Sequence, residues 1–282
     1  MNRSLSAQKR ISRIVEYTFC VLVTLAVLIP LYVAVTGGMK SKGQLMSQPL
    51  AWPDPIQFFQ YTDLLIGKVG TFWRALANSG LIATGTIGLT LTFCTTAAFA
   101  LARLRFRGNS LIQGYFMLGL LFPLAVAILP LYLQIRTLGL LDSFWGVILP
   151  QVAFQIPLIV LLLRGFFLSI PRDLEDACAI DGHGPLGFLW NMVLPLSTPI
   201  LATAGVLVLV FSWNNFFLPL LVFNEAASFT LPMGVMAFQG QHSADWQLIL
   251  GYLTLAMVPA VILFVAAQRY IVAGLTGGAV KG

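Results

Sequence analysis

Residues 174–199, LEDACAIDGHGPLGFLWNMVLPLSTP, form a polar island in the middle of an otherwise apolar chain. Four of the ten acidic residues of the protein lie in or directly before this stretch: Asp173, Glu175, Asp176 and Asp181. The stretch then passes through Asp-Gly-His-Gly-Pro and ends in an apolar run that Pro195 and Pro199 divide. Because long apolar runs flank the stretch on both sides, its position divides the chain and decides the topology.

The chain as a whole has the composition of a membrane protein. Only 9% of its 282 residues are charged and 58% are hydrophobic, whereas soluble domains carry about 25% charged residues. Five charge-free runs each reach the roughly 20 residues that cross a hydrocarbon core as a helix. These runs cover 17–39, 75–102, 108–135, 143–163 and 246–268. No ten-residue alternation favours a barrel, so we expect an all-α membrane protein.

A sixth run, 182–224, contains only His183 as a titratable group. It is too long for one span and too short for two spans with a turn. Because Pro195 and Pro199 divide it, we interpret 184–194 as a re-entrant or interfacial segment and 199–222 as the span. We therefore predict one transmembrane domain, 14–270, with six helices at about 15–38, 76–101, 110–133, 144–164, 199–222 and 247–268.

The loop charges predict the orientation of these helices. With the N-terminus inside, eleven Lys and Arg residues fall on the cytoplasmic side and five on the outside, which fits the positive-inside rule. We therefore expect both ends, residues 1–13 and 271–282, in the cytoplasm. The first apolar run, 17–39, is longer than the apolar part of a signal peptide, which favours a retained membrane anchor.

Several classes of function lack their sequence motifs. The chain has neither a GxxxxGK[ST] nucleotide loop nor an HExxH zinc motif, so we expect no catalytic residue and place any ATP hydrolysis on another subunit. Cys20, Cys94 and Cys178 lack CxxC spacing, and His183 and His242 fall on opposite sides of the predicted membrane, so no metal site is expected. Basic residues do not interleave with aromatic residues outside the spans, which argues against nucleic-acid binding.

Two groups of polar residues lie inside predicted spans. Gln151 and Gln155 are one helical turn apart in the fourth span, and Trp213, Asn214 and Asn215 are adjacent in the fifth. Such residues either hydrogen-bond a neighbouring helix, for about 0.6 kcal/mol on average, or line a polar passage for substrate. Both interpretations stay open. No charge lies deep in any span, which argues against a proton or sodium relay.

The start of the polar island predicts a short cytoplasmic helix. Pro171 suits the first turn, and Gly182 can end the helix with a positive φ. Acids near the helix start complement the positive end of the helix dipole: Asp173, Glu175 and Asp176. An apolar stripe follows at helical spacing: Leu174, Ala177 and Cys178. This helix either docks in a groove of another protein or is a solvated loop helix.

The same stretch resembles the EAA loop of ABC-importer permeases. That loop has Glu-Ala-Ala, then Gly after three positions, and Ile-x-Leu-Pro about nine residues later. Here Asp176, Ala177 and Cys178 occupy the Glu-Ala-Ala positions, Asp181-Gly182 the Asp-Gly position, and 192–195 the end. The chain departs from the pattern with Asp for Glu, Cys for Ala and His183 in place of a small residue. Glu175 is a second candidate for the acidic role.

Five further stretches resemble carbohydrate permeases within this family. FSWNNFFLPLLV at 211–222 is similar to their Trp-Asn-acid-Phe segment, with Asn215 in place of the acid. The C-terminal part of maltose-permease-like subunits is similar to two stretches, FTLPMGVMAF at 229–238 and QRYIVAGLTGGAVKG at 268–282. The similarity extends over nearly the whole chain through NSGLIAT at 78–84 and LPLY at 129–132. The chain thus resembles the second permease subunit of a carbohydrate ABC importer.

The resemblance implies a type I importer fold with six spans and a coupling helix in the loop 171–195, in a bacterial inner membrane. It implies four kinds of partner besides membrane lipid: a second permease that shares the translocation path, two ATP-binding cassette subunits that hold ATP and magnesium, an extracytoplasmic solute-binding protein, and a carbohydrate substrate. No cofactor is expected in this chain. The alternative function is an ATP-independent channel or secondary transporter for small solutes.

The resemblance also implies roles for particular residues. The ATPase subunits should contact the coupling helix and its end: Leu174, Glu175, Asp176, Ala177, Cys178, Asp181 and Gly182. The C-terminal tail, through Gly277, Gly278 and Lys281, should reach between the ATPase subunits. The side chains of Leu174, Ala177 and Cys178 are expected to provide most of the shape fit, because exposed ion pairs contribute only about 0–1 kcal/mol.

Overall fold

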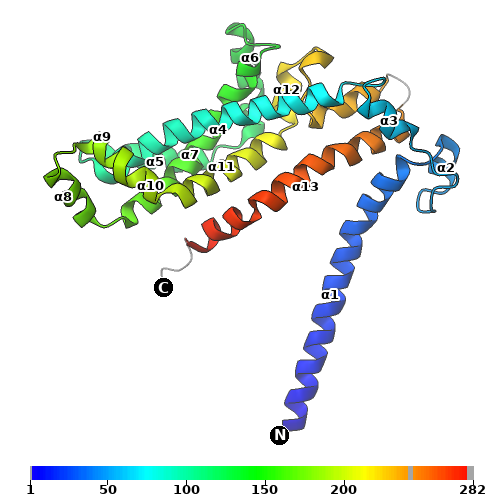
Figure 1. The fold of residues 1–282 in the computed structure, drawn as a ribbon, viewed down its shortest axis with the longest axis horizontal. Helices are drawn as coiled ribbons and strands as arrows, with labels where there is room; N and C mark the ends of the chain where they lie inside the picture. Colours follow the sequence, from blue (N-terminus) through cyan, green and yellow to red (C-terminus); the bar gives the residue numbers. More distant parts are fainter. Residues whose placement is uncertain (1, 241–243, 278–282) are drawn as a thin grey trace. The chain divides into compact units, whose positions relative to one another are not determined.

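The computed structural model describes residues 2–240 and 244–277, with side chains for 12–240 and 244–268. The described residues are helical apart from turns, loops and one isolated antiparallel bridge between Gln239 and Ala244 (Figure 1). They form two compact units: Met1–Phe72 with Val235–Pro259, and Trp73–Gly234 with the chain from Ala260 onward. Four described helices are long and apolar enough to cross a membrane, and two bent helix pairs raise the number to six if each pair is one span.

Four of the predicted spans are single continuous helices. They are α1 (Asn2–Gly37), α4 (Phe72–Arg103), α7 (Phe144–Ser169) and α13 (Trp246–Gly277). Their apolar side chains suit lipid, and a helix satisfies its own backbone hydrogen bonds there. Because α1 already begins at Asn2, the basic N-terminal segment continues the first span as one helix.

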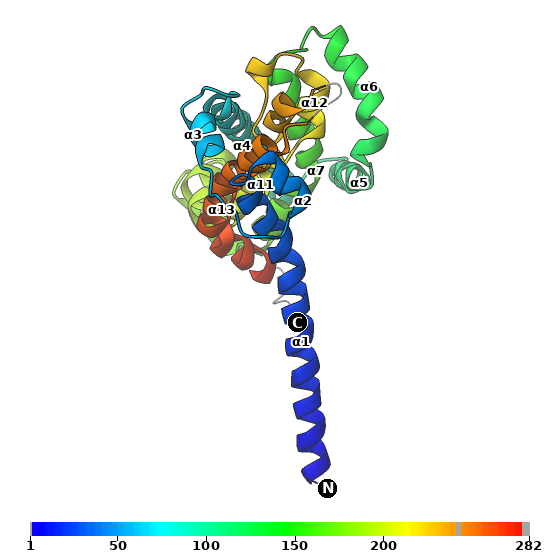
Figure 2. The same cartoon turned by 90° about the vertical axis from the view of Figure 1, so that its right-hand side faces the viewer.

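The third predicted span, 110–133, is a bent pair and not one straight helix. α5 (Asn109–Leu120) and α6 (Leu124–Thr137) meet at 101°, and Figure 2 shows α6 turning away from α5. The cause is Pro123, which has no N–H to continue the helix and disfavours helical geometry at the residue before it. The chain leaves α5 through a tightened turn, in which the Leu121 N–H donates to the Leu118 carbonyl at 3.0 Å.

The fifth predicted span, 199–222, is also interrupted. α11 (Thr198–Trp213) contains the first part of this span, and α12 (Phe217–Val222) follows after a break. The preceding segment, predicted to be re-entrant or interfacial, is helical and meets α11 at 77°. It consists of α9 (Pro185–Phe188), the π-helical turn η1 (Leu189–Val193) and α10 (Leu194–Leu196).

Short elements connect these helices. In the first unit, α2 (Lys42–Ser47) and α3 (Phe59–Leu65) follow α1. In the second unit, α8 (Arg172–Ile180) connects α7 to α9, and the 3₁₀ turn η2 (Ala226–Ser228) follows α12. Another 3₁₀ segment, η3 (Pro232–Phe238), leads toward α13.

α7 is the centre of the second unit. It packs against α5, α6, α11 and α12, and its apolar side chains belong to two buried clusters. The cluster around its C-terminal half contains Leu163 and Phe167, both fully buried, and it also takes in Cys178 of α8 and Phe188 of α9. One continuous core therefore joins the membrane helices to the loop that follows them.

Glycines allow α7 to approach its neighbours closely. A Cβ on Gly119 of α5 would lie 2.9 Å from Cγ of Pro157, and one on Gly85 of α4 would lie 2.9 Å from Cδ1 of Ile148. A Cβ on Gly146 would overlap the backbone carbonyl oxygen of Leu140. Small residues have this role in membranes because close packing, and not the hydrophobic effect, drives helix association there.

A carboxylate closes the turn before α7. Asp142 has a positive φ of 55°, and its Oδ1 accepts a hydrogen bond of 2.6 Å from the Asn224 backbone N–H. Its Oδ2 accepts a second bond, of 3.0 Å, from Nδ2 of Asn224. These bonds, with the side chain of Asn224 contributing most, hold the pKa of Asp142 below its ordinary value. The α6–α7 turn is thereby joined to the chain after α12.

We predict that Gly146→Ala destabilises the protein by about 1–3 kcal/mol, because the new methyl group collides with backbone that cannot move without shifting the turn. Gly165→Ala, in the same helix, is the matched control. No atom lies within 4 Å of a Cβ at position 165, so this change should leave stability unchanged or raise it by up to about 1 kcal/mol. Thermal unfolding of the purified protein in detergent compares them, and equal midpoints for both variants would refute the packing argument.

We predict that Asp142 contributes stability that depends on pH. Because its folded pKa is lowered, the contribution is complete above the ordinary aspartate pKa of about 3.9 and is lost as the pH falls through the folded value. Asp142→Asn tolerates the positive φ but does not titrate. The unfolding midpoint of the wild type should exceed that of Asp142→Asn at neutral pH, and the gap should close in acid. A gap independent of pH would contradict this prediction.

Candidate functional site

The helix α8 has the ends that its sequence predicts. It begins after Pro171, and Asp173 and Glu175 lie in its first turn, near the positive end of the helix dipole. Gly182 has a φ of +83°, and the helix closes with N–H to carbonyl bonds from Gly182 to Ala179 and from His183 to Cys178, both 3.0 Å. This pair is the Schellman arrangement that a positive-φ glycine makes possible. The sequence prediction of a short helix ended by Asp181-Gly182 is confirmed.

α8 presents two different faces. Cys178 is 2% exposed and belongs to the buried core, with Leu174 half-buried beside it. The opposite face carries side chains at the helical spacing i, i+3, i+4 and i+7: Asp173, Asp176, Ala177 and Ile180. Ile180 is 87% exposed, the largest exposed fraction among the exposed large apolar residues described. The expected docking stripe of Leu174, Ala177 and Cys178 is therefore divided, since two of its three members pack inward.

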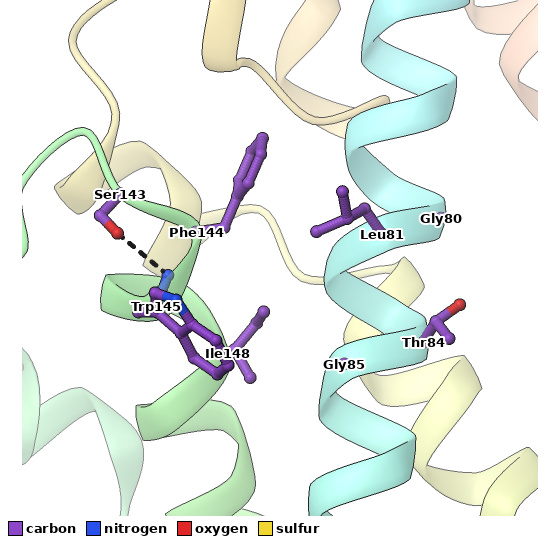
Figure 3. A pocket seen from close by; sticks show the side chains of 8 residues that line it. All are labelled: Gly80, Leu81, Thr84, Gly85, Ser143, Phe144, Trp145 and Ile148. Carbon is purple, nitrogen blue, oxygen red and sulfur yellow. Dashed lines mark hydrogen bonds between the residues drawn. The ribbon is translucent and has the colours of Figure 1, made fainter.

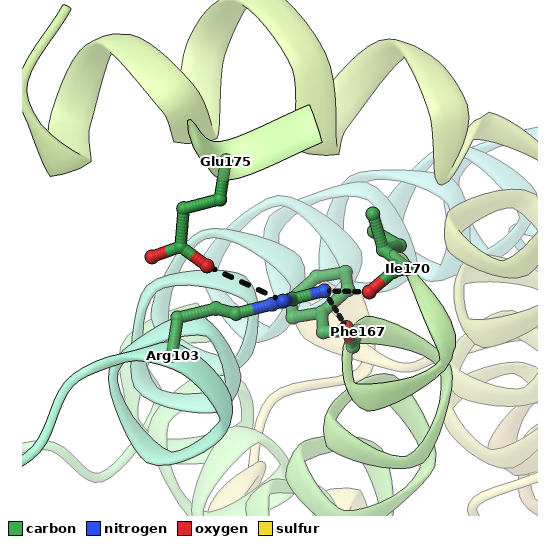
Figure 4. Close-up of polar contacts among 4 residues, drawn as sticks. All are labelled: Arg103, Phe167, Ile170 and Glu175. Atoms are coloured by element: carbon green, nitrogen blue, oxygen red, sulfur yellow. Dashed lines mark hydrogen bonds and ion pairs between the residues drawn. The ribbon is translucent and has the colours of Figure 1, made fainter. Parts of the chain in front are cut away.

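Arg103, the last residue of α4, anchors the inner face of α8 (Figure 4). Its side chain is only 4% exposed, and its Nη1 lies 3.3 Å from Oε2 of Glu175. Its Nη2 donates to the backbone carbonyls of Phe167 and Ile170 at 2.6 and 2.5 Å, and the guanidinium lies 5.8 Å from the ring centre of Phe188. One side chain thus contacts α4's neighbours α7, α8 and α9.

The choice of arginine at this position has a physical reason. The last carbonyls of a helix lack partners within the helix and carry partial negative charge. A guanidinium can donate to several acceptors at once in a fixed plane, which an ammonium cannot do. The sequence does not predict this role, because Arg103 begins the short basic stretch RLRFR, 103–107, whose charges fit an ordinary cytoplasmic link between two spans. The available signal was an arginine at the very end of a long apolar run.

The two neighbouring acids of α8 have different surroundings. Glu175 is paired with Arg103 inside the chain. Asp176 lies on the outward face, and within the described part of the chain no ion pair involves it. The sequence left open which acid serves a partner; the geometry leaves Asp176 available and Glu175 occupied.

The two glutamines of the fourth span lie in the interior of the second unit. Gln151 is 1% exposed, and its Oε1 accepts hydrogen bonds from Thr86 of α4 at 3.1 Å and from Ser212 of α11 at 2.6 Å. Gln155 is 5% exposed. The side-chain oxygen of Gln151 thus joins three helices, α4, α7 and α11, which is one of the two interpretations left open by the sequence.

Trp213 is the last residue of α11, and Asn214 and Asn215 lie in the break between α11 and α12. Nδ2 of Asn214 donates to the Val210 carbonyl at 2.9 Å, and Oδ1 of Asn215 accepts the Leu218 N–H at 3.1 Å. Asparagine side chains compete in this way with the helical backbone bonds and favour helix ends. Asn214 is exposed, whereas Trp213 and Asn215 are half-buried. The residues that the sequence offered as a substrate path thus define a break in a membrane helix.

A cavity of about 540 Å³ lies between α4 and the first turns of α7. Figure 3 shows its lining: Gly80, Leu81, Thr84 and Gly85 from α4, and Ser143, Phe144, Trp145 and Ile148 from the start of α7. Its side chains are mostly apolar, and the Ser143 hydroxyl is already engaged by the Trp145 N–H at 3.3 Å. A sugar needs many hydrogen-bonding partners, so this lining is a poor match for a carbohydrate site.

Some predicted site residues lie outside this description. Gly278, Lys281 and His242 are not among the described residues, and only the helical backbone is described at Gly277. Among the described residues, no group of three or more His, Cys, Asp or Glu side chains is arranged to hold a metal ion.

Comparison with known proteins gives the same family over most of the chain. Residues 94–276 match the model of the family described as "Binding-protein-dependent transport system inner membrane component". The chain is 36% identical to the permease protein SmoH of the sulfoquinovosyl glycerol transport system of Agrobacterium fabrum, over 86% of this chain and 85% of that protein. It is 31% identical to the arabinooligosaccharides transport system permease protein AraQ of Bacillus subtilis, over 98% of this chain and 99% of that protein.

A solved structure has the same fold. It is a bacterial ABC transporter involved in the import of the acidic polysaccharide alginate, and its matching chain aligns with a TM-score of 0.78 over 93% of this chain and 96% of that chain, at 24% identity. A second structure, of the alginate transporter with a periplasmic protein that holds an alginate pentasaccharide, aligns with a TM-score of 0.66 at 14% identity, over 93% of this chain and 95% of that chain. These matches show the fold of an importer permease. Together with the family match, they place the polar loop around α8 within a membrane domain of known architecture, and the chain belongs to the binding-protein-dependent transport system inner membrane component family.

Proposed function

We propose that this chain is a transmembrane permease subunit of an ATP-driven carbohydrate importer in a bacterial inner membrane. Relatives named for sulfoquinovosyl glycerol and arabinooligosaccharides match the chain over most of its length, as does the trehalose permease protein SugB of Mycobacterium tuberculosis, at 36% identity over 82% of this chain and 84% of that protein. These names support a sugar or a sugar derivative as the substrate. The excess of basic residues in alternate loops supports an orientation with both termini in the cytoplasm.

The proposed complex has several further components. A second permease forms the translocation path with this chain, and an extracytoplasmic solute-binding protein delivers the sugar. This chain has no phosphate-binding GxxxxGK[ST] loop. We therefore assign the binding of ATP and magnesium to two ATP-binding cassette subunits. The tail around Gly277, Gly278 and Lys281 contacts those subunits.

The observation that carries the proposal is the division of α8 into two faces. Its inner face is bound to this chain through Cys178 and through Glu175. Its outer face carries Asp176, Ala177 and the highly exposed Ile180. An exposed apolar side chain surrounded by acids is typical of a protein contact. We therefore assign the ATPase contact to the outer face and to the end of the helix at Asp181-Gly182, and we give Leu174, Glu175 and Cys178 the role of holding the helix in place.

This arrangement lets α8 transmit force. A partner that grips the outer face moves the whole helix, and the inner contacts pass that movement to α4 and α7. The partner must hold α8 differently in its two states, because equal affinity for both would shift nothing. The sugar path lies near the α11–α12 break, where Asn214 is exposed and Trp213 and Asn215 are half-buried, and excludes the interior Gln151 and Gln155.

We predict that Ile180→Asp abolishes ATP-dependent sugar uptake. The change places a charge at the C-terminal end of the outer face, where it must be desolvated against the ATPase, and it leaves the inner contacts intact. The measurement is uptake into vesicles that contain the complete complex, with ATP and the solute-binding protein supplied. Phe106→Asp is the matched control, since Phe106 is another exposed apolar residue in the adjacent α4–α5 turn.

Three outcomes decide this experiment. Loss of uptake and of ATPase co-purification for Ile180→Asp, with an active Phe106→Asp, supports the outer face as the coupling contact. Full uptake by Ile180→Asp refutes that assignment. Uptake by this chain alone, without ATP, refutes the importer function itself and selects the ATP-independent channel or transporter.

We predict that Arg103→Ala uncouples ATP hydrolysis from transport and Arg103→Lys does so less. Alanine leaves the helix-end carbonyls of α7 without a donor and frees Glu175, whereas lysine keeps the charge but cannot satisfy three acceptors in one plane. The ratio of sugar transported to ATP hydrolysed should fall in the order wild type, Lys, Ala, with the ATPase still bound. Arg105→Ala, in the following link, is the control, and equal ratios for all four proteins would count against the anchor.

A further inference from the structure

The segment after α1, residues 38–66, buries two long polar side chains and exposes a group of large apolar side chains between positions 46 and 59. Lys40 and Gln60 are 0% and 1% exposed. In contrast, the large apolar side chains between positions 46 and 59 are between 47% and 66% exposed: Met46, Leu50, Trp52, Ile56, Phe58 and Phe59. Leu45 and Leu64, on either side of this stretch, are buried. A loop surrounded by water has the opposite arrangement, because exposing apolar surface to water is unfavourable. The exposed apolar group between positions 46 and 59 is what a lipid environment favours.

Lys40 holds the segment together from within. Its Nζ donates to the carbonyl oxygens of Pro49 at 2.6 Å and Gln48 at 3.3 Å. Its own carbonyl accepts bonds from Nε2 of Gln247 at 2.9 Å and of Gln60 at 3.3 Å. Burial lowers the pKa of Lys40, and among the described residues no carboxylate pairs with it. The ammonium is thus used to satisfy backbone and not to meet an acid.

The backbone of the exposed loop is satisfied by side chains of its own unit. Besides the two carbonyls that Lys40 takes, the Leu50 carbonyl accepts a bond from the Tyr32 hydroxyl at 3.3 Å. The Trp52 carbonyl accepts one from Nε2 of Gln44 at 2.9 Å, and Oε1 of the same glutamine accepts the Asp54 N–H at 3.2 Å. Four of the five carbonyls from Gln48 to Trp52 therefore have protein donors. Loops in water do not need this, but backbone in contact with lipid does.

The hydrogen bonds also give the depth of the loop relative to α1. Tyr32 lies five residues before the end of α1 at Gly37, which is about 7.5 Å along the helix axis. Tyr61 of α3 donates its hydroxyl to the Val35 carbonyl at 2.7 Å. The candidate span Ser12–Gly37 has 26 residues, more than the roughly 20 that cross the hydrocarbon core. The tip at Leu50 therefore lies level with the last turns of the membrane-spanning helix and not beyond them.

We infer that residues 46–59 form a membrane-inserted hairpin, whose apolar side chains enter the lipid leaflet that α1 reaches at its C-terminal end. Leu50 and Trp52 lie deepest, and Trp52 belongs to the class of side chain that concentrates at membrane interfaces. Lys40 pins the hairpin against α1 and so fixes its depth. The inference rests on α1 as a membrane span and does not depend on the proposed transport function.

Spin-label accessibility tests this inference in the complete complex. Single cysteines at positions 50 and 52 are labelled in a chain that lacks Cys20, Cys94 and Cys178, and the complex is reconstituted in vesicles of phosphatidylethanolamine and phosphatidylglycerol. Collision with oxygen reports lipid, and collision with a water-soluble nickel chelate reports water. Gly43 is the control position, because it is exposed beside Lys42 and no atom lies within 4 Å of a Cβ there.

The expected result is an oxygen-to-nickel ratio several-fold higher at positions 50 and 52 than at position 43. A ratio equal to that of position 43 overturns the inference. The labels at positions 50 and 52 could also be shielded from both probes. If this shielding disappears when the solute-binding protein or the second permease is omitted, the inference is overturned in favour of a protein partner.

A second pair of variants tests the pin. Lys40→Met removes the donor to Gln48 and Pro49, so the label at position 50 should become more mobile and its oxygen-to-nickel ratio should fall. Lys42→Met, which changes an exposed lysine two residues away, should leave both readings unchanged. An unchanged oxygen-to-nickel ratio at position 50 in Lys40→Met would overturn this part of the inference, because it would show that the Lys40 side chain does not hold the hairpin at its depth.

Discussion

The buried guanidinium of Arg103 is the contact on which the arrangement around α8 depends. It donates to the last carbonyls of α7, pairs with Glu175 of α8 and stacks near Phe188 of α9. Without it, α8 would be attached to the membrane helices mainly by Leu174 and Cys178, which is too small an apolar face to orient a nine-residue helix. An isolated helix of this length is unstable in water, so the tertiary anchor also maintains its secondary structure. The outer face can be offered to a partner only because the inner face is fixed.

The same physical rule recurs in other loops of both units. In a low-dielectric environment an unpaired backbone carbonyl costs more than in water, and long polar side chains are recruited to meet it. Lys40 and Gln44 do this for the loop after α1. In the second unit, Asn78 of α4 donates to the carbonyls of Ala227 and Phe229, both at 3.0 Å. Irregular backbone near a membrane is thus held by individual polar side chains, and their loss should affect whole loops.

Charge and length predicted the parts of the fold that depend on solvent. The runs that became α1, α4, α7 and α13 are visible because lipid excludes charge, and Asp181-Gly182 marks a helix end because only certain residues adopt a positive φ. The bend at Pro123 could also be predicted from the sequence, since proline in a span removes a backbone bond. A count of apolar residues alone does not reveal this bend. The inward pairing of Glu175 was not predictable, because its partner Arg103 lies 72 positions away and its reach depends on how α4 and α7 end together.

The polar contacts of the second unit also differ in strength, and this difference limits how the unit can move. Arg103 joins α4 to the end of α7 through two bonds from a charged group, each worth about 1.5–3 kcal/mol. It joins α4 to α8 through its pair with the part-exposed Glu175, which contributes less because solvent screens it. Gln151 joins α7 to α11 through a neutral bond to Ser212, and such bonds in membranes average about 0.6 kcal/mol. A displacement of α8 that keeps the Arg103 contacts must carry the ends of α4 and α7 with it. When only polar contacts are compared, the separation of α7 from the end of α11 costs the least free energy. This place lies next to the break at Asn214 and Asn215.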